Sequence, residues 1–326
     1  YQPVTRRGVI IKLGAAGDVL RSTPLLRALA SGKTGTRVLF VTHHPDLIPK
    51  EAAEAVKPDA LVIERLKQCR WDFVWNLDKD LEACLLLEAT NSEEKRGFGL
   101  KEEGVPFPLD ENALHKFATG VDDIYSKQNT KTYPEEIFEI VEMPYHREEY
   151  WLKEPHEDDF REVDRLFPGS NWIGLNTGAG WRWPTRLWSE ENWSELARLL
   201  VVAGYSPIFL GGPEEEERNS RLAAVTELPS SGTLTLPVFY ALVHRCRAVV
   251  TSVTQMMHLA IAAKRPLVVL NNIFNRHEFE LYGRGKIIEP LTPCGCFYSP
   301  TCLSGRQCID EIRPDAVFRE IHGLLR

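Results

Sequence analysis

Short apolar runs alternate with helical patterns along this chain, and the alternation starts twice. The first series has apolar runs at 9–13, 36–41, 61–63 and 73–76, with helical patterns to Ala30 and to Val56. The second has apolar runs at 172–176, 207–210, 248–251 and 267–270, with helical patterns at 192–203 and 214–224. Strands that alternate with helices are typical of parallel sheets with crossover helices. The sequence therefore predicts an α/β fold with two Rossmann-like domains facing a cleft, which is a favoured place for a ligand.

We predict a first domain over residues 1–160 and a second over 161–326. The stretch 90–165 carries many glycines and prolines and is expected to form surface loops and helices, with the linker near 155–170. The last helical pattern, 315–325, is a candidate to pack back on the first domain.

Composition excludes several classes of protein. The 326 residues are 43% hydrophobic and 26% charged, which is ordinary for a globular chain of two domains. The formal net charge of −7 argues against a general nucleic-acid binder. No apolar stretch approaches the roughly 20 residues of a membrane-spanning helix, and the N-terminus lacks a secretory signal pattern. We expect a cytoplasmic protein without a nucleic-acid partner.

The turn after the first apolar run carries one carboxylate, Asp18. Gly14 and Gly17 remove side-chain bulk around it, and Arg21 adds a polar group one helical turn later. A ligand at the carboxyl end of the first strand would lie beside this carboxylate. The alternative is that Asp18 caps the helix N-terminus, where aspartate is favoured.

The turn that opens the second series has the composition of an anion site. Thr177 and Gly178 follow the apolar run, and Arg182 and Arg186 precede the next helical pattern. Backbone N–H groups and arginine side chains donate to phosphate oxygens, so this turn suits a diphosphate. The alternative is that the tryptophans of this segment form interdomain core, with the arginines stacked over them.

Two more turns follow later apolar runs of the second series. The glycine turn at 211–212 leads into an acidic run that includes Glu215, a composition that is also common at helix starts. Thr254 is placed to cap the next helix, and His258 follows in its first turns. That histidine is either a hydrogen-bonded structural residue or a functional group at the sheet edge.

Four of the seven cysteines lie within fifteen residues, at Cys294, Cys296, Cys302 and Cys308. Four thiolates in one loop suit tetrahedral Zn²⁺ or a mononuclear iron, and a reducing cytosol argues against permanent disulfides. The spacing departs from that of usual zinc sites, so two disulfides or free thiols stay open as alternatives. A closed site of four cysteines would stabilise the loop rather than perform chemistry.

Five segments, in this order, resemble glycosyltransferase family 9, the heptosyltransferase group that builds the inner core of bacterial lipopolysaccharide. They are IIKLGAAGDVLRSTPLLRAL, NTGAGWRWPTRLWSEENWSELA, FLGGPEEEER, VTSVTQMMHLAIA and NNIFNRHEFELYGRG. The resemblance implies the glycosyltransferase B architecture, with an ADP-sugar donor held mainly by the second domain and the acceptor mainly by the first. It implies inverting transfer of a sugar, with heptose expected, to a hydroxyl of a glycan, a lipid-linked saccharide or a protein.

The resemblance also assigns roles to residues. Asp18 becomes the general base, beside an acceptor-side turn that contains Gly14, Gly17 and Arg21. The donor would be bound by Thr177, Gly178, Arg182, Arg186, Glu215, Thr254 and His258, with Arg186 standing where the family usually has a phosphate-binding lysine. The scheme requires no catalytic metal. A lipid-linked acceptor would bring the protein into peripheral contact with the inner membrane.

Two other functions stay open. A nucleotide-sugar epimerase of the same architecture would need no acceptor site beside Asp18. A metal-containing protein that binds a nucleotide sugar without transferring it is the second alternative, suggested by Val253, which stands where many family members have an aspartate. The triplet Asp78-Lys79-Asp80 matches the metal-binding D-x-D of another glycosyltransferase class, but it lies in the wrong domain for the donor.

Overall fold

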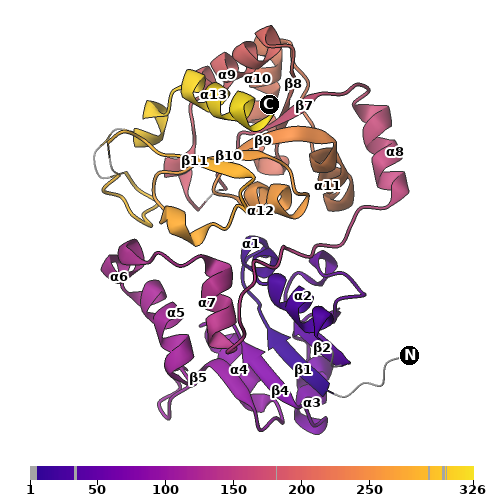
Figure 1. The fold of residues 1–326 in the computed structure, drawn as a ribbon, viewed down its shortest axis with the longest axis vertical. Coiled ribbons are helices and arrows are strands. Elements are labelled where there is room, and N and C mark those ends of the chain that lie inside the picture. Colours follow the sequence, from indigo (N-terminus) through magenta and orange to yellow (C-terminus); the bar gives the residue numbers. More distant parts are fainter. Residues whose placement is uncertain (1–5, 33–34, 181, 293, 303–304, 306) are drawn as a thin grey trace. The chain divides into compact units, whose positions relative to one another are not determined.

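The computed structural model describes residues 6–32, 35–180, 182–292, 294–302, 305 and 307–326. They form two compact units. The first comprises the described residues up to Lys153 and the segment His277–Glu280, and the second comprises Glu154–Arg276 and Leu281–Arg326. The units thus divide at 153/154, where the sequence predicted 160/161, and four residues from late in the chain belong to the first unit. Each unit contains a parallel sheet with helices, which confirms the predicted α/β class (Figure 1).

The first unit is built on a six-stranded sheet with strand order β3-β2-β1-β4-β5-β6. Neighbouring strands are parallel except β5 and β6. The central strands are continuous buried apolar runs, as in sheets that are covered on both faces. The strands are β1 (Arg6–Ile11), β2 (Thr36–Val41), β3 (Glu54–Val56), β4 (Phe73–Asn76), β5 (Lys95–Leu100) and β6 (Pro106–Pro108).

Helices α3 and α4 cover one face of this sheet. Their buried Leu66 and Leu87 belong to one apolar cluster with Val9, Val41 and Val74 of the strands. The helices of the unit are α1 (Ala16–Leu20), α2 (Pro24–Ser31), α3 (Ala60–Gln68), α4 (Leu81–Ala89), α5 (Glu111–Val121), α6 (Asp123–Gln128) and α7 (Tyr133–Ile140).

Two local predictions for the first unit are wrong. Residues 61–63 belong to α3 and not to a strand, because Asp59 caps the helix at the Val62 N–H and the helical pair Val62 and Leu66 is buried. A three-residue apolar run fits either period, so it could not decide between them. The helical pattern to Val56 is instead a 3-10 turn, η1 (Pro45–Leu47), followed by β3.

The first helical pattern is also divided in two. The hydroxyls of Ser22 and Thr23 donate to the carbonyls of Val19 and Leu20, which ends α1, and α2 starts at Pro24. Proline is favoured at a first helical position because it has no N–H to lose there. The result is a very short α1 that presents the Asp18 turn.

The second unit is built on a five-stranded sheet with strand order β11-β10-β9-β7-β8, and each neighbouring pair is parallel. Four of its strands confirm the apolar runs of the second series. The strands are β7 (Trp172–Asn176), β8 (Ser206–Leu210), β9 (Cys246–Ser252), β10 (Leu267–Leu270) and β11 (Gly285–Ile288). The helices are α8 (Glu157–Leu166), α9 (Glu190–Val202), α10 (Glu216–Thr226), α11 (Leu236–Arg245), α12 (Gln255–Ala262) and α13 (Pro314–Leu324).

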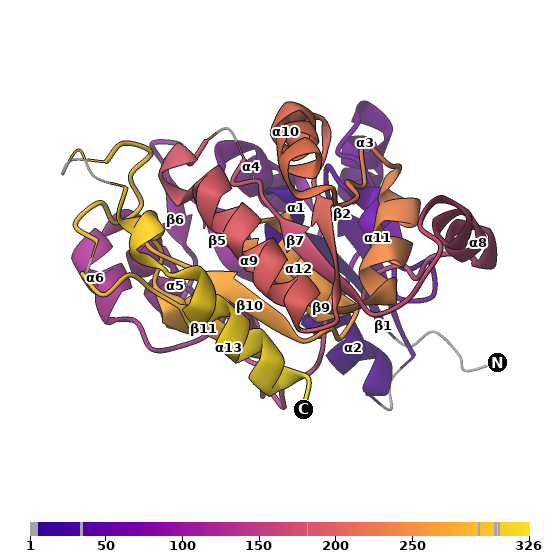
Figure 2. The same ribbon diagram turned by 90° about the horizontal axis from the view of Figure 1, so that it is seen from above.

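The last helix, a candidate from the sequence to pack on the first domain, belongs to the second unit and packs within it. Val317 and Ile321 of α13 are fully buried and share one apolar cluster with Leu200 of α9 and Leu270 of β10. Figure 2 shows α13 lying beside α9 along the sheet. The apolar stripe of α13 is therefore buried within the second unit.

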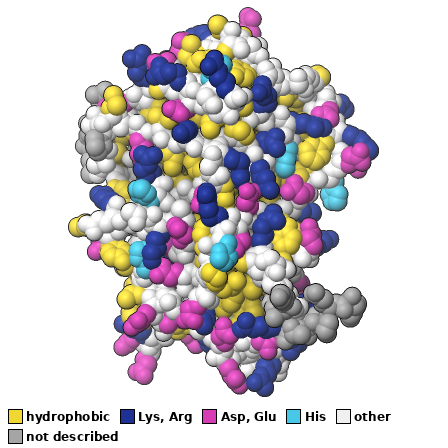
Figure 3. Space-filling view, in the orientation of Figure 1, with side chains coloured by type: hydrophobic (Ala, Val, Ile, Leu, Met, Phe, Trp, Pro, Cys, Tyr) yellow, Lys and Arg dark blue, Asp and Glu magenta, His cyan; other side chains and the backbone are white. Residues whose placement is uncertain are grey.

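No described helix is long and apolar enough to cross a membrane. On the face seen in Figure 3, basic and acidic side chains are interspersed. No field of a single sign therefore covers the described part of that face.

Candidate functional site

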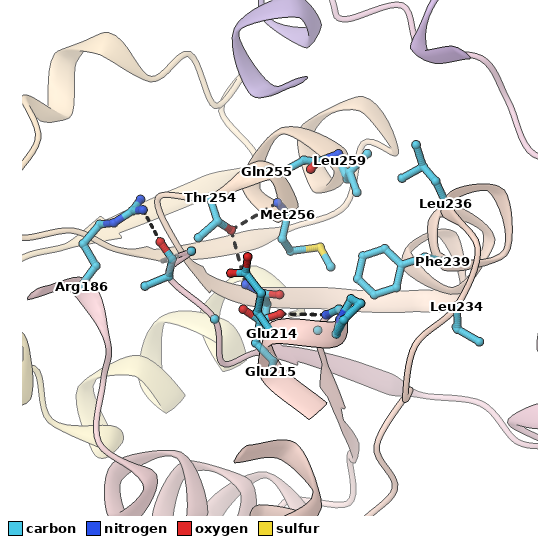
Figure 4. Close-up of a pocket in the computed structure, with 17 residues that line it drawn as sticks. Arg186, Glu214, Glu215, Leu234, Leu236, Phe239, Thr254, Gln255, Met256 and Leu259 are labelled. Atoms are coloured by element: carbon cyan, nitrogen blue, oxygen red, sulfur yellow. Dashed lines mark hydrogen bonds between the residues drawn. The ribbon is translucent and has the colours of Figure 1, made fainter. Parts of the chain in front are cut away.

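The second unit contains a cavity of about 490 Å³ at the carboxyl ends of β7, β8 and β9. Parallel α/β sheets bind ligands at this edge because the connecting turns leave backbone groups and helix starts exposed there. Figure 4 shows its two sides. The polar side chains are Asn176, Arg186, Glu214, Glu215, Thr254 and Gln255, and the apolar ones are Leu234, Leu236, Phe239, Met256 and Leu259.

Two glycine turns pack around Glu215. A Cβ on Gly178 would lie 2.3 Å from Glu215 Oε1, and one on Gly211 would lie 2.5 Å from Glu215 Cβ. Glu215 Oε2 accepts a hydrogen bond of 2.8 Å from the Gly212 N–H. Only glycine fits Gly178 and Gly211 without a shift, so both turns expose bare backbone to the cavity.

Arg186 is a buried cation without a carboxylate partner among the described residues. It is 6% exposed, its Nη2 donates to the Ala179 carbonyl, and its Nε is buried without a hydrogen-bond acceptor. Its guanidinium lies 5.1 Å from the centre of the Phe274 ring. Burial lowers the pKa of Arg186 to about 10. A buried charge is costly unless it is paired, so an anionic ligand in this cavity would supply the missing partner.

Thr254 starts α12 at the floor of the cavity, as predicted. Its hydroxyl accepts from the Met256 N–H at 3.2 Å and exchanges a hydrogen bond of 3.1 Å with Thr251. Asn176, the last residue of β7, donates to the same hydroxyl at 3.4 Å. These bonds tie the start of α12 to the sheet edge and fix the helix N-terminus beside the cavity.

The remaining candidates lie outside the described lining of the cavity. The Thr177 hydroxyl donates to Asn219 of α10 at 2.6 Å, so this side chain is used to join β7 to α10. Arg182 is exposed and lies 5.1 Å from the Trp183 ring. His258 is buried within α12. The structure thus brings four of the expected donor residues together at the cavity: Gly178, Arg186, Glu215 and Thr254.

Two tryptophans of the same segment are core residues of the second unit, and not the interdomain core that the alternative expected. Trp188 and Trp193 are fully buried within the second unit, with ring centres 4.9 Å apart. They lie in the core of this unit, and Arg186 lies over a phenylalanine instead of either ring. The segment therefore combines core tryptophans with an arginine at the cavity.

Asp18 lies in the first turn of α1, at the carboxyl end of β1. Position 15 is the N-cap and makes no side-chain cap bond. Asp18 Oδ1 accepts from Arg21, at 2.7 Å from Nη2 and 3.0 Å from Nε. The Arg21 guanidinium lies 3.7 Å from the Tyr133 ring centre, and Glu278 of the segment His277–Glu280 is 3.7 Å from its Nη1. Asp18 thus pairs with a fixed cation while 36% of its side chain is exposed.

A second ion pair lies beside this turn. The Lys12 ammonium is bonded to Asp78 Oδ1, and the Gly14 N–H donates to Asp78 Oδ2 at 2.8 Å. Lys12 is 3% exposed, and burial opposes its charge, but attraction by Tyr133, Asp78 and Asp18 raises its pKa above the usual value. Burial raises the pKa of Tyr133 to about 12. Gly17, which was also expected at this turn, lies within α1, directly before Asp18.

The cysteine-rich loop brings some of its thiols together. The Cys296 N–H donates to Cys294 Sγ at 3.3 Å, and Asn272 donates to Cys308 Sγ at 3.5 Å. Burial, and then a hydrogen bond and the nearby charge of Cys308, raise the pKa of Cys294 to about 12. Across the described part of the chain, no group of three or more His, Cys, Asp or Glu side chains is arranged to hold a metal ion. Residues 293, 303, 304 and 306 of this loop lie outside the described residues.

Sequence reasoning missed two parts of these sites. Lys12 and Asp78 beside Asp18 were not predicted, although a single charge at the end of an apolar strand run is a usable signal. The apolar wall formed by Leu234, Leu236 and Phe239 was missed as well, because the helical pattern of α11 was not recognised.

Comparison with known proteins identifies a family whose model this chain matches. Residues 60–288 match the model of glycosyltransferase family 9 (heptosyltransferase). Lipopolysaccharide heptosyltransferase 2 of Salmonella typhimurium is 27% identical over 163 residues, which are 47% of this chain and 46% of that protein. In sequence, the chain spans about half the length of the curated relatives that it matches.

Two solved structures share the fold over nearly the whole chain. E. coli ADP-heptose lipopolysaccharide heptosyltransferase II has a TM-score of 0.72 at 19% identity, covering 98% of each chain. An E. coli heptosyltransferase with ADP-2-deoxy-2-fluoro heptose has a TM-score of 0.65 at 17% identity, covering 97% of this chain and 99% of the other. The family model covers more than half of the sequence, and this chain therefore belongs to glycosyltransferase family 9.

Proposed function

We propose that this protein transfers a heptosyl group from ADP-heptose to an acceptor hydroxyl with inversion at the anomeric carbon. The observation that carries the proposal is Arg186, which is buried at the cavity and has no carboxylate partner among the described residues. Glycine backbone, an apolar wall and polar side chains that include Glu214 and Glu215 form the rest of the lining. A diphosphate would compensate the guanidinium charge, and a flat purine suits the apolar wall. A heptosyltransferase of the same fold is solved with an ADP-heptose analogue, which supports this choice of donor.

The cavity has the chemistry to stabilise the leaving group. As the bond between the anomeric carbon and the diphosphate breaks, negative charge develops on ADP. Arg186, the N–H groups of the Gly178 and Gly211 turns and the start of α12 are fixed before the reaction, and such donors are commonly worth about 3–4 kcal/mol each. Glu215 holds the two turns against each other and lies where the resemblance places an acid near the adenosine. No catalytic metal is needed in this scheme.

Asp18 is the proposed general base. The acceptor oxygen attacks the anomeric carbon from the face opposite the diphosphate, and its proton passes to the Asp18 carboxylate. Arg21 holds one carboxylate oxygen, and the exposed part of the side chain leaves room for the acceptor hydroxyl. The acceptor is proposed to be a saccharide of a lipopolysaccharide core, with a lipid-linked or protein acceptor as outcomes of the assay. We place the reaction in the cytoplasm, in peripheral contact with the inner membrane where the acceptor is lipid-linked.

For the cysteine-rich loop we propose a structural Zn²⁺ or iron held by Cys294, Cys296, Cys302 and Cys308. Thiolates suit either metal, and the contacts among three of these residues support the set. Because the described residues do not yet surround one point, the loop would tighten on binding. Such a metal would stabilise the fold without taking part in transfer.

The deciding experiment measures donor binding and turnover with purified protein. ADP-heptose is compared with UDP-, GDP- and CMP-sugars by calorimetry, and turnover is followed with and without a lipopolysaccharide-core acceptor, in wild type and in Asp18→Asn. Selective ADP-heptose binding with turnover that is lost in the variant supports the proposal. Tight donor binding without turnover on any acceptor would leave a nucleotide-sugar-binding protein. Conversion of the free nucleotide sugar that Asp18→Asn spares would indicate an epimerase.

A further inference from the structure

The Asp78 carboxylate binds the turn that carries Asp18. Asp78 follows β4, the strand next to β1, and its own N–H donates to Asn76 at 3.0 Å. One oxygen of Asp78 is bonded to the Lys12 ammonium and the other accepts the Gly14 N–H. Asp78 therefore links the end of β4 to the side chain before the turn and to the backbone of the turn itself.

Lys12 and Asp18 face the same glycine. A Cβ on Gly14 would lie 3.1 Å from Lys12 Nζ, 3.4 Å from Asp78 Oδ1 and 3.5 Å from Asp18 Oδ2. The ammonium is thus close to both carboxylates, and it is shielded from water because the Lys12 side chain is 4% exposed. In a buried setting such charges interact more strongly than they would in water.

A carboxylate that acts as a general base must be ionised at the working pH and must still be basic enough to accept a proton. A buried ammonium without its own counter-charge would favour the ionised form of Asp18 strongly and so weaken it as a base. Asp78 supplies that counter-charge. Its side chain is 9% exposed, against 36% for the side chain of Asp18.

We propose that Asp78 is a positioning residue for Asp18: it fixes the Gly14 turn and, by neutralising Lys12, keeps the Asp18 carboxylate basic. This inference rests on the proposed function of Asp18 as the general base. It gives the Asp78-Lys79-Asp80 triplet a role in the acceptor-side unit that involves no metal. The charged and titratable groups near Asp18 include Lys12, Arg21, Tyr133, Glu278 and Asp78.

The test is a direct titration of Asp18. Protein labelled with ¹³C at the aspartate side-chain carboxyl is followed by NMR across pH, and the Asp18 signal is assigned by its loss in Asp18→Asn. In Asp78→Asn the pKa of Asp18 is expected to fall by about one unit, because removal of a nearby negative charge favours the ionised form. Asp80→Asn is the matched control, because Asp80 is exposed and makes no side-chain cap bond on α4. It should leave the Asp18 titration unchanged.

Kinetic measurements distinguish a positioning role of Asp78 from a role in stability alone. With ADP-heptose and a lipopolysaccharide-core acceptor, Asp78→Asn is expected to lower kcat about tenfold at pH 7, to leave KM for the donor unchanged, and to move the acid limb of the kcat profile to lower pH. A folded Asp78→Asn protein in which Asp18 titrates as in wild type overturns the inference.

A variant that does not fold is replaced by Lys12→Met. Loss of the cation then raises the pKa of Asp18 if the inference holds, and an unchanged titration overturns it. Full activity of Asp18→Asn would refute the proposed function alone, because the NMR titration does not depend on transfer.

Discussion

Arg21 and Asp18 form an ion pair one helical turn apart, with 2.7 Å between Nη2 and Oδ1, and the Arg21 guanidinium lies 3.7 Å from the Tyr133 ring centre. The arginine is held by the ring and by Glu278 as well as by Asp18. Arg21 therefore orients the carboxylate, and 36% of the Asp18 side chain is exposed.

Asp18→Asn should therefore remove transfer and spare donor binding. A general base commonly contributes 10²–10⁴-fold, so kcat is expected to fall by about that factor. Calorimetry with ADP should give an unchanged Kd, because the cavity lies in the other unit of the chain. A loss of ADP binding of the same size as the loss of kcat would contradict the assignment.

Arg186→Met should weaken ADP binding about 10–100-fold, since a charge-assisted pair to phosphate is lost. The same change should leave stability unchanged or raise it, because it removes a buried cation that has no carboxylate partner in the described structure. Arg182→Met is the matched control, as Arg182 is exposed. Equal loss of ADP affinity in both variants would argue against Arg186 as the phosphate ligand.

Gly178→Ala should damage both folding and donor binding. The new methyl group would lie 2.3 Å from Glu215 Oε1, so Glu215 must leave its place between the turns, at a cost of about 1–3 kcal/mol. Gly212→Ala serves as control, because its methyl group would come no closer than 3.8 Å to the same side chain. Thermal unfolding and ADP titration of the two variants check the expected difference.

The lowered pKa of Lys79 should make the stability of the protein depend on pH. Burial, and then repulsion by Lys116, lower the pKa of Lys79 to about 8, below its unfolded value of 10.5. Below pH 8 the folded protein must hold a disfavoured charge, and between pH 8 and 10.5 the unfolded chain binds more protons, so this penalty fades as pH rises. Lys79→Met should be more stable than wild type by roughly 2 kcal/mol at pH 7, and this advantage should shrink toward pH 10.5. Urea unfolding at both pH values measures it, and a difference that does not change with pH would refute the assignment.

Metal content checks the cysteine-rich loop. Elemental analysis of protein purified without chelator is expected to give about one Zn or Fe per chain, and Cys302→Ser should lower both the metal content and the melting temperature. Cys84→Ser is a control outside the loop, since Cys84 is buried in the first unit. Metal-free protein with unaltered stability would favour free thiols.

The sequence by itself determined the α/β class, the restart of the strand series near residue 171 and the turns that carry Asp18, Gly178, Glu215 and Thr254. These features are local, because a buried parallel strand and the glycine turn after it are written in consecutive residues. The 61–63 run shows the limit of that information. Three apolar residues fit a strand or a helix equally, and only burial of Val62 with Leu66 decided for α3.

The tertiary structure alone decided which charges meet. Lys12 and Asp78 are 66 positions apart and pair because β1 and β4 are neighbours in the sheet. Arg186 lines the cavity and has no carboxylate partner among the described residues. The Thr177 hydroxyl donates to Asn219 and lies outside the described lining of the cavity. Pairing of buried polar groups depends on distances between elements far apart in sequence, and no local pattern encodes those distances.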